Sequence, residues 1–205
     1  MGLSQGAVDA RKKADFFVCL TLGMALALAA AIELSGDLGR EWLRYDRAAI
    51  ADGELWRLLG GHWVHLGWSH FLLNGIGLLL IAYLVAANFS RWQWLMITAA
   101  VIAGIDLGFW FLQPQLVWYV GMSGLLHGLL AAGTVNGLRC RPRESWLIAA
   151  FLVGKLGYEQ LLGPLPGSEE TTGGNVVVAA HLYGAMSGAL AGLCFSFRKS
   201  PDAPI

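Results

Sequence analysis

Long apolar stretches alternate with short polar segments along the whole chain. Six of these stretches are about 18–22 residues long, and a helix of that length, rising about 1.5 Å per residue, crosses a hydrocarbon core of about 30 Å. The pattern predicts an all-α membrane protein in which six transmembrane helices form one domain over residues 1–205. The predicted helices cover about residues 15–33, 68–88, 92–112, 117–138, 145–163 and 176–197, with one long loop over 34–67.

The composition supports a membrane protein and argues against other classes. Hydrophobic residues make up 56% of the chain, charged residues only 14%, and the mean hydropathy is +0.56. A soluble domain carries about 25% charged residues. The net charge of zero gives no indication of a nucleic-acid partner. Cys19, Cys140 and Cys194 show no paired spacing, so the sequence predicts neither a disulfide framework nor a zinc ribbon.

The basic residues predict the orientation of the helices. With the N-terminus in the cytoplasm, nine Lys and Arg residues fall in cytoplasmic segments and four in the loop over 34–67, which is the bias expected of cytoplasmic loops. We therefore predict that both termini are cytoplasmic and that this loop lies outside. The nine are Arg11, Lys12, Lys13, Arg91, Arg139, Arg141, Arg143, Arg198 and Lys199, and the four are Arg40, Arg44, Arg47 and Arg57. The first apolar stretch resembles a secretory signal, but it is longer than the usual apolar core of one, so we predict a retained helix.

Polar residues enter three of the predicted helices at one depth. Asn74, Ser123 and His181 each lie five to seven residues from the outer start of their helix, which corresponds to about 7–10 Å at the helical rise. His70 lies one helical turn before Asn74. Polar side chains are costly inside a bilayer and mark functional sites by default. We therefore predict that these four residues share one site.

The chemical types of these residues suit hydrolysis of an amide bond. A serine hydroxyl is a weak nucleophile that needs an adjacent base, and histidine is the usual one, as in the pair Ser123 and His181. The oxyanion that forms needs preorganised donors. Asn74 and His70 can supply side-chain donors, and Ser123 can add a backbone N–H near a helix N-terminus.

Small residues predict close contact between the helices that carry this pair. They repeat at every fourth position after Ala180, and they also surround Ser123. Such faces allow the backbones of membrane helices to approach closely, which a hydrogen bond between Ser123 and His181 requires. The alternative is that the glycines serve helix packing alone. They are Gly121, Gly124, Gly128, Gly184, Gly188 and Gly192.

Four short motifs follow one another along the chain. They are Trp56-Arg57 in the long loop, His65, His70 and Asn74 in an HxxxxHxxxN pattern, Gly121-Met122-Ser123-Gly124, and His181-Leu182-Tyr183-Gly184. Together they resemble the motifs of the rhomboid intramembrane serine proteases. The resemblance covers nearly the whole chain from about Glu54.

This resemblance implies a serine-type intramembrane endopeptidase in a rhomboid-like bundle, with Ser123 as nucleophile and His181 as general base. His70, Asn74 and the Ser123 N–H would form the oxyanion hole, and the site would be a dyad without a third, acidic residue. The resemblance implies no cofactor and no metal. Its partners would be the lipid bilayer and transmembrane substrates, cut at a site that opens to the periplasm from a bacterial inner membrane. Residues expected to support the site are His65, Gly121, Gly124, His127 and Gly184.

His127 departs from the rhomboid pattern. Typical rhomboids carry a tyrosine four residues after the serine, packed against the catalytic histidine, whereas this chain has His127. The short chain and this motif look like the rhombosortase branch, which implies substrates with a C-terminal Gly-Gly motif, an apolar helix and a basic tail. His127 either replaces one flat ring by another or orients His181 or contacts substrate. Alternatives to the branch are a rhomboid protease of other single-pass substrates and a non-catalytic rhomboid-like binder.

The remaining polar residues suggest weaker alternatives. His62, His65 and His70 lack a neighbouring carboxylate in sequence, which argues against a metal site. Asp106 is a single membrane carboxylate, whereas an aspartyl protease needs two. Lys155 and Glu159 are four residues apart and form either a structural ion pair or part of a substrate gate. A small-molecule transporter would show inverted repeats, and the sequence shows none.

Overall fold

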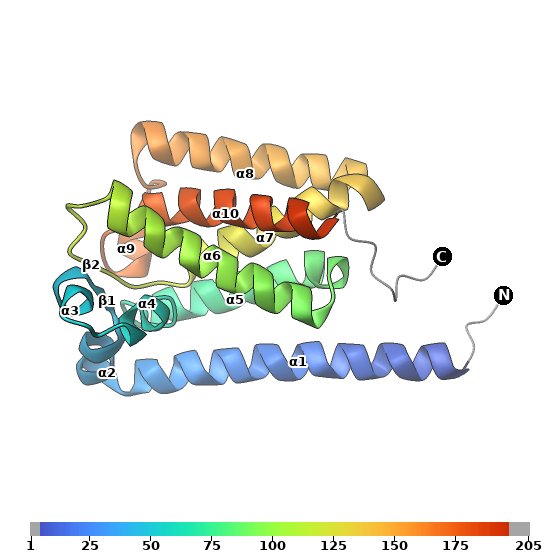
Figure 1. Cartoon of the computed structure of the whole chain (residues 1–205), viewed down its shortest axis with the longest axis horizontal. Coiled ribbons are helices and arrows are strands. Elements are labelled where there is room, and N and C mark those ends of the chain that lie inside the picture. The colour runs from blue at the N-terminus through green and yellow to red at the C-terminus, as the bar shows by residue number, and fades with distance from the viewer. Residues whose placement is uncertain (1–4, 197–205) are drawn as a thin grey trace.

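The computed structural model describes residues 5–196, with side chains described from Cys19 onward. Six long helices run side by side, and the short helices and strands gather at one end of this bundle (Figure 1). The elements are α1 (Gln5–Leu34), α2 (Gly36–Leu43), β1 (Tyr45–Asp46), α3 (Arg47–Ala51), α4 (Trp56–Gly60), α5 (Trp68–Val85), η1 (Ala86–Asn88), α6 (Arg91–Leu112), β2 (Trp118–Tyr119), α7 (Ser123–Cys140), α8 (Pro142–Leu162), α9 (Ser168–Thr172) and α10 (Val178–Ser196).

Three helices within residues 5–196 are long and apolar enough to cross a membrane. They are α5 with η1, α6 and α10, and a fourth span is possible if α1 and α2, which meet at a 114° bend, count as one. The 18 residues of α7 and the 21 of α8 also suffice in length, but glycines and polar residues lower their mean hydropathy. The start of α1 and the end of α10 lie at the same end of the bundle (Figure 1). Arg198, Lys199 and the tail over 200–205 lie outside the described residues.

The predicted fourth span, 117–138, begins too early. Residues 118–119 form β2, which pairs antiparallel with β1 through Tyr45 opposite Tyr119, and α7 starts only at Ser123. Gly121 has a φ of +135°, a conformation that side-chain-bearing residues rarely adopt, and this turn separates the strand from the helix. The depth estimate from helical rise therefore does not apply to Ser123, which is the first residue of its helix.

Glycines hold α7 and α10 in direct backbone contact, as the small-residue pattern predicts. A Cβ added to Gly124 would lie 2.9 Å from the carbonyl oxygen of Ala180. A Cβ on Gly184 would collide with the carbonyl of Gly124, and one on Gly188 with that of Gly128. The contact runs along both helices and places the first turn of α10 against the first turn of α7.

Replacing Gly188 by alanine tests this contact. We expect Gly188→Ala to destabilise the protein by about 1–3 kcal/mol, because an added methyl group must push two backbones apart. The measurement is the midpoint of thermal unfolding in detergent. Gly154→Ala in α8 is the matched control, since a Cβ there meets nothing within 4 Å, and it should leave the midpoint unchanged or raise it. Equal midpoints for both variants would contradict the packing argument.

The Trp56-Arg57 motif holds the loop at one end of the bundle together. Arg57 is buried and donates hydrogen bonds to the carboxylate of Glu54 at 2.6 Å and to the carbonyl oxygen of Glu41 at 2.7 Å. Trp56 donates from its indole N–H to the carbonyl of Trp42 at 3.1 Å. These bonds tie α2 to α4, and the chain continues from α4 through His65 into α5. The motif thus fixes the loop from which the chain leads to His65 and His70.

Candidate active site

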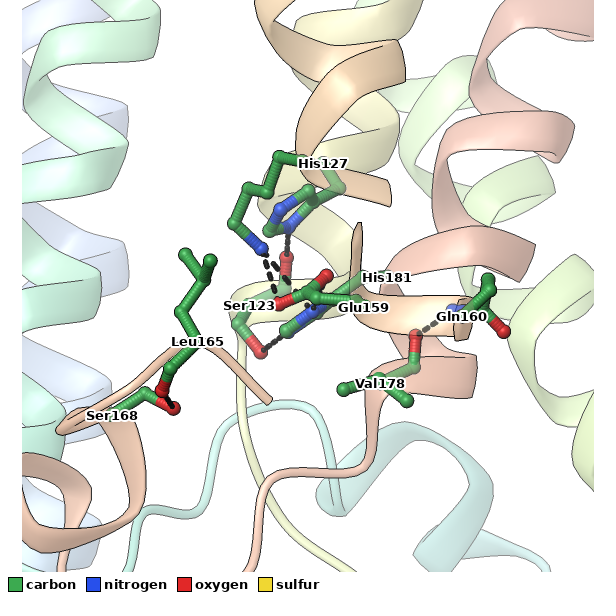
Figure 2. A network of polar contacts seen from close by, with 9 residues as sticks. Ser123, His127, Glu159, Gln160, Leu165, Ser168, Val178 and His181 are labelled. Atoms are coloured by element: carbon green, nitrogen blue, oxygen red, sulfur yellow. Dashed lines mark hydrogen bonds and ion pairs between the residues drawn. The ribbon is translucent and has the colours of Figure 1, made fainter. Parts of the chain in front are cut away.

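Ser123 and His181 meet between the first turns of α7 and α10. The Ser123 Oγ lies 2.9 Å from the His181 Nε2, which is hydrogen-bonding distance (Figure 2). His181 is 5% exposed and Ser123 is half-buried. The glycine contacts at 124 and 184 bring the two backbones close enough for these short side chains to touch. The pair predicted from sequence is therefore brought together.

A carboxylate adjoins the other nitrogen of the same imidazole. The Glu159 Oε2 lies 2.9 Å from the His181 Nδ1, and the Glu159 Oε1 accepts from the Lys155 Nζ at 2.6 Å. Lys155 and Glu159 thus form the predicted ion pair. The expected dyad without an acid differs from the structure, because α8 presents Glu159 directly to the histidine.

His127 stacks on the imidazole of His181. The two ring centroids are 4.2 Å apart with an interplanar angle of 17°. The His127 Nδ1 also lies 2.7 Å from the backbone oxygen of Ser123, one helical turn back (Figure 2). The His127 ring takes the stacking position expected for the tyrosine of typical rhomboids, and it covers one face of the His181 ring.

Two more predicted residues, His70 and Asn74 of α5, line a cavity that Ser123 and His181 also line. This cavity measures about 210 Å³ and is lined by residues of α5, α7, α8 and α10 and of the segment around α9. The His70 Nδ1 accepts the backbone N–H of Leu66 at 3.3 Å, so the neutral ring carries its proton on Nε2 and can donate from there. Asn74 is 6% exposed, and its Nδ2 has no hydrogen-bond partner in the described part of the chain.

A buried amide donor without a partner calls for an explanation. Its neighbours in the cavity wall, Ser123 and His181, suggest that a substrate oxygen supplies the missing acceptor. The helix N-terminus of α7 adds a backbone N–H and a favourable dipole at the same place.

The rhomboid domain family matches residues 52–198. The chain belongs to the rhomboid family. An uncharacterized protein of Mycobacterium bovis is 30% identical over 184 residues, which cover 83% of this chain and 72% of that protein. An uncharacterized protein of Mycobacterium leprae is 29% identical over 192 residues, covering 86% and 71%. A Bacillus subtilis protein named "Putative rhomboid protease YdcA" is 24% identical over 143 residues, covering 69% and 67%.

Membership of the rhomboid family, together with the apolar helices, indicates an integral membrane protein related to intramembrane proteases. Proteases of this family act on membrane proteins within the bilayer. The matched segment includes all four motifs that suggested the resemblance and all residues of the Ser123–His181–Glu159 cluster.

His65, the first histidine of the rhomboid pattern, packs beside the site without entering it. It is 1% exposed, and its ring contacts His70 and Phe71 edge to face, with centroids 5.1 and 5.6 Å away. Burial, together with the nearby His70, lowers the pKa of His65 to about 3, so the ring is neutral near pH 7. A neutral ring packed on His70 fits the supporting role expected of His65.

Of the three histidines of the metal alternative, His65 and His70 lie with ring centroids 5.1 Å apart, whereas His62 bonds to Asp106 at 3.3 Å. This bond also engages the carboxylate that an aspartyl mechanism would use. In the described part of the chain, the ligand group with metal-like spacing is His127, Glu159 and His181, whose ligand atoms lie within 4.8 Å of one another. The ammonium group of Lys155, 2.6 Å from Glu159, would repel a cation there.

Sequence reasoning missed the contact between Glu159 and His181, although a signal for it was present. Ser145, Leu152 and Glu159 are the buried residues of α8, and they are spaced by seven, which places them on one stripe of the helix. A carboxylate at the third position of a buried stripe needs partners in the protein. Lys155, four residues earlier, was an evident partner for Glu159, so nothing in the sequence prompted a search for a second partner.

Proposed function

We propose that this rhomboid is an intramembrane serine endopeptidase in which Ser123 is the nucleophile and His181 the general base. The observation that carries this proposal is the 2.9 Å contact between Ser123 Oγ and His181 Nε2 in a cavity walled by membrane helices. A structural serine in a membrane helix usually bonds to its own helix backbone, as Ser187 does to Tyr183. Ser123 instead faces an imidazole and a cavity.

The reaction follows from these contacts. His181 Nε2 takes the hydroxyl proton as Ser123 Oγ attacks the carbonyl carbon of the scissile bond, and the π pair moves to the carbonyl oxygen. The tetrahedral intermediate collapses as His181 gives its proton to the leaving nitrogen, which breaks the C–N bond and leaves an acyl ester on Ser123. Water, deprotonated by His181, then attacks the ester, and the second collapse returns the proton to Ser123.

His70, Asn74 and the Ser123 N–H would bind the oxyanion in both tetrahedral intermediates. Each can donate into the cavity, and the Asn74 Nδ2 has no competing acceptor in the described residues. Donors that are fixed before the charge develops stabilise the transition state without reorganisation.

For the topology, we propose six spans with both termini in the cytoplasm of a bacterium and the site open to the periplasm. Six long helices run along the bundle, and the bias of basic residues favours this orientation. The Lys155–Glu159 pair offsets the charge that α8 would bring into lipid, because each side chain neutralises the other. The site lies near the end of the bundle where α2, α3 and α4 gather (Figure 1).

For the substrate, we propose a membrane-tethered protein with a C-terminal Gly-Gly motif, an apolar helix and a basic tail. The support is the replacement of the stacking tyrosine by His127 within the motif around Ser123. A pair of glycines also suits the cavity chemically, because an extended segment without side chains can approach the Ser123 Oγ between closely packed helices.

Two matched substrates test both the protease activity and the preference for a Gly-Gly motif. The purified protein, reconstituted in liposomes, is given one single-pass protein with a Gly-Gly tail and the same protein with both glycines changed to leucine. We expect cleavage of the first to be at least about 10-fold faster, the range that pocket contacts give. Equal cleavage of both would reject the Gly-Gly preference and leave a general rhomboid protease. Cleavage of neither, nor of other single-pass proteins, would reject the protease itself.

A further inference from the structure

Glu159 is a buried carboxylate whose two oxygens have different partners. The side chain is 3% exposed, with Oε1 at 2.6 Å from the Lys155 Nζ and Oε2 at 2.9 Å from the His181 Nδ1. Burying a charge is unfavourable unless other charges and donors compensate it. An ion pair with Lys155 alone would meet that need, so the second contact calls for a separate explanation.

The position of Glu159 on α8 favours a role at the histidine. The buried stripe of this helix runs from Ser145 through Leu152 to Glu159, and much of the rest of its surface is exposed. Glu159 lines the cavity together with Ser123 and His181. Its carboxylate lies at the level of the His181 ring, within hydrogen-bonding distance of the Nδ1 (Figure 2).

The two neighbours of His181 Nδ1 compete for opposite tautomers. A carboxylate only accepts hydrogen bonds, so Glu159 selects the form with the proton on Nδ1 and the lone pair on Nε2, facing Ser123. An ammonium group only donates, so Lys155 would select the reverse form, which cannot take the serine proton. The distances are 2.9 Å for Glu159 and 3.5 Å for Lys155. Because hydrogen bonds weaken with distance, the closer Glu159 favours the form with an unprotonated Nε2.

We propose that Glu159 is a positioning residue that completes a Ser123–His181–Glu159 array, an inference that rests on the serine-protease function proposed above. Glu159 holds the proton of His181 on Nδ1 in the resting protein. When Nε2 takes the Ser123 proton, the carboxylate faces the positive imidazolium and stabilises it, and it stays unprotonated throughout. Protons pass between Ser123, His181 Nε2 and the leaving nitrogen in the first half of the reaction, and between water, His181 Nε2 and Ser123 in the second.

Lys155 balances the charge of this array. Without it, the negative Glu159 would favour the protonated form of His181, which cannot accept the Ser123 proton. The groups that face His181 are His127 from α7, Lys155 and Glu159 from α8, and His70 from α5. Asp106 of α6 bonds to His62 instead. Lys155 and Glu159 therefore act on the charge of His181 in opposite directions.

The test compares Glu159→Gln with wild type in a cleavage assay over a range of pH. We expect kcat to fall by about 100-fold or more with KM nearly unchanged, because the amide cannot hold the tautomer or face the imidazolium. The acid limb of the pH–rate profile should move to lower pH, because Lys155 then disfavours the imidazolium without opposition. Lys155→Met should move the same limb to higher pH, because Glu159 then favours the imidazolium alone.

Controls separate this role from folding. Glu144→Gln makes the same chemical change at an exposed position of the same helix and should keep the wild-type rate and profile. Glu159→Asp should recover part of the loss, because it restores a carboxylate one methylene group further away. If Glu159→Gln proves to be aggregated, Glu159→Asp and Lys155→Met decide through their pH profiles.

Labelling of Ser123 by a fluorophosphonate distinguishes the two possible failures. Slow labelling of Glu159→Gln beside fast labelling of wild type supports the array. If the Glu159 variants keep the labelling rate, kcat and pH profile of wild type, the proposed role of Glu159 is wrong. The assignment of a serine protease is then unaffected. If wild type itself is neither labelled at Ser123 nor able to cleave a transmembrane substrate, the proposed function fails, and the array fails with it.

Discussion

Ser123→Ala should abolish cleavage of every transmembrane substrate that the wild-type protein cuts. Removing the Oγ removes the atom that forms the acyl ester, and the loss should be at least about 1,000-fold, down to the detection limit of the assay. The measurement is the appearance of the cleaved fragment on a gel after incubation in detergent or liposomes. Folding should be retained, because the backbone contacts of α7 with α10 do not use the hydroxyl group.

Ser187→Ala is the matched control for this loss. Ser187 lies on α10, and its hydroxyl bonds to the carbonyl of Tyr183 at 2.7 Å within its own helix. Its removal should leave cleavage at the wild-type rate. Cleavage that survives in Ser123→Ala would show that another residue supplies the nucleophile, and the serine assignment would then be wrong.

The sequence predicts the chemistry of this site better than its architecture. His181, His70 and Asn74 could be selected because each is a polar residue within a membrane helix, where polarity is costly. Ser123 could be selected because its hydroxyl is a nucleophile that suits a histidine base. The glycines at 124 and 184 could be matched to the close approach of α7 and α10, because only small residues permit it. These inferences depend on local chemical type and on helical spacing, and a single sequence contains both.

The start of α7 could not be predicted, because the apolar residues before it serve a different element. Val117, Trp118, Tyr119 and Val120 read as the first turn of a membrane helix, yet the structure has the short strand β2 there. The pairing partner, β1, lies more than seventy residues earlier in the chain. Hydropathy alone does not distinguish an apolar strand from an apolar helical turn.

The contact between Glu159 and His181 escaped prediction for a related reason. Four-residue spacing links Glu159 to Lys155 within α8, and such pairs can be read from sequence. The contact with His181 depends on how α8 is rotated against α10, and side chains from three helices decide that rotation. The family pattern also pointed to a dyad, so it argued against looking for an acid.

The array of Ser123, His181 and Glu159 changes how α8 can be interpreted. If Lys155 and Glu159 are part of a substrate gate, the alternative left open by their spacing, movement of α8 would carry Glu159 away from His181. The base would then lose its tautomer control while the gate is open and regain it on closure. Substrate entry and activation of the nucleophile would be linked through one hydrogen bond of 2.9 Å.

Asn74→Ala should separate activity from stability. The Nδ2 of Asn74 is buried and has no protein partner in the described residues, so it links no other protein group to the fold. Its removal should leave the unfolding midpoint unchanged or raise it, because a buried unsatisfied donor is itself unfavourable. We expect kcat to fall about 100- to 1,000-fold with little change in KM, since this donor is satisfied when the oxyanion forms.

Asn136→Ala is the matched control and should show the opposite pattern in the same assays. Asn136 donates to the Ser196 Oγ at 3.1 Å and does not line the cavity. That variant loses a hydrogen bond present in the resting fold, so its unfolding midpoint should drop while kcat stays at the wild-type value. A drop in midpoint for Asn74→Ala with unchanged kcat would show that Asn74 is a packing residue. The paired result, with Asn74→Ala slow but stable and Asn136→Ala active but less stable, would identify Asn74 as a donor that serves the transition state and not the fold.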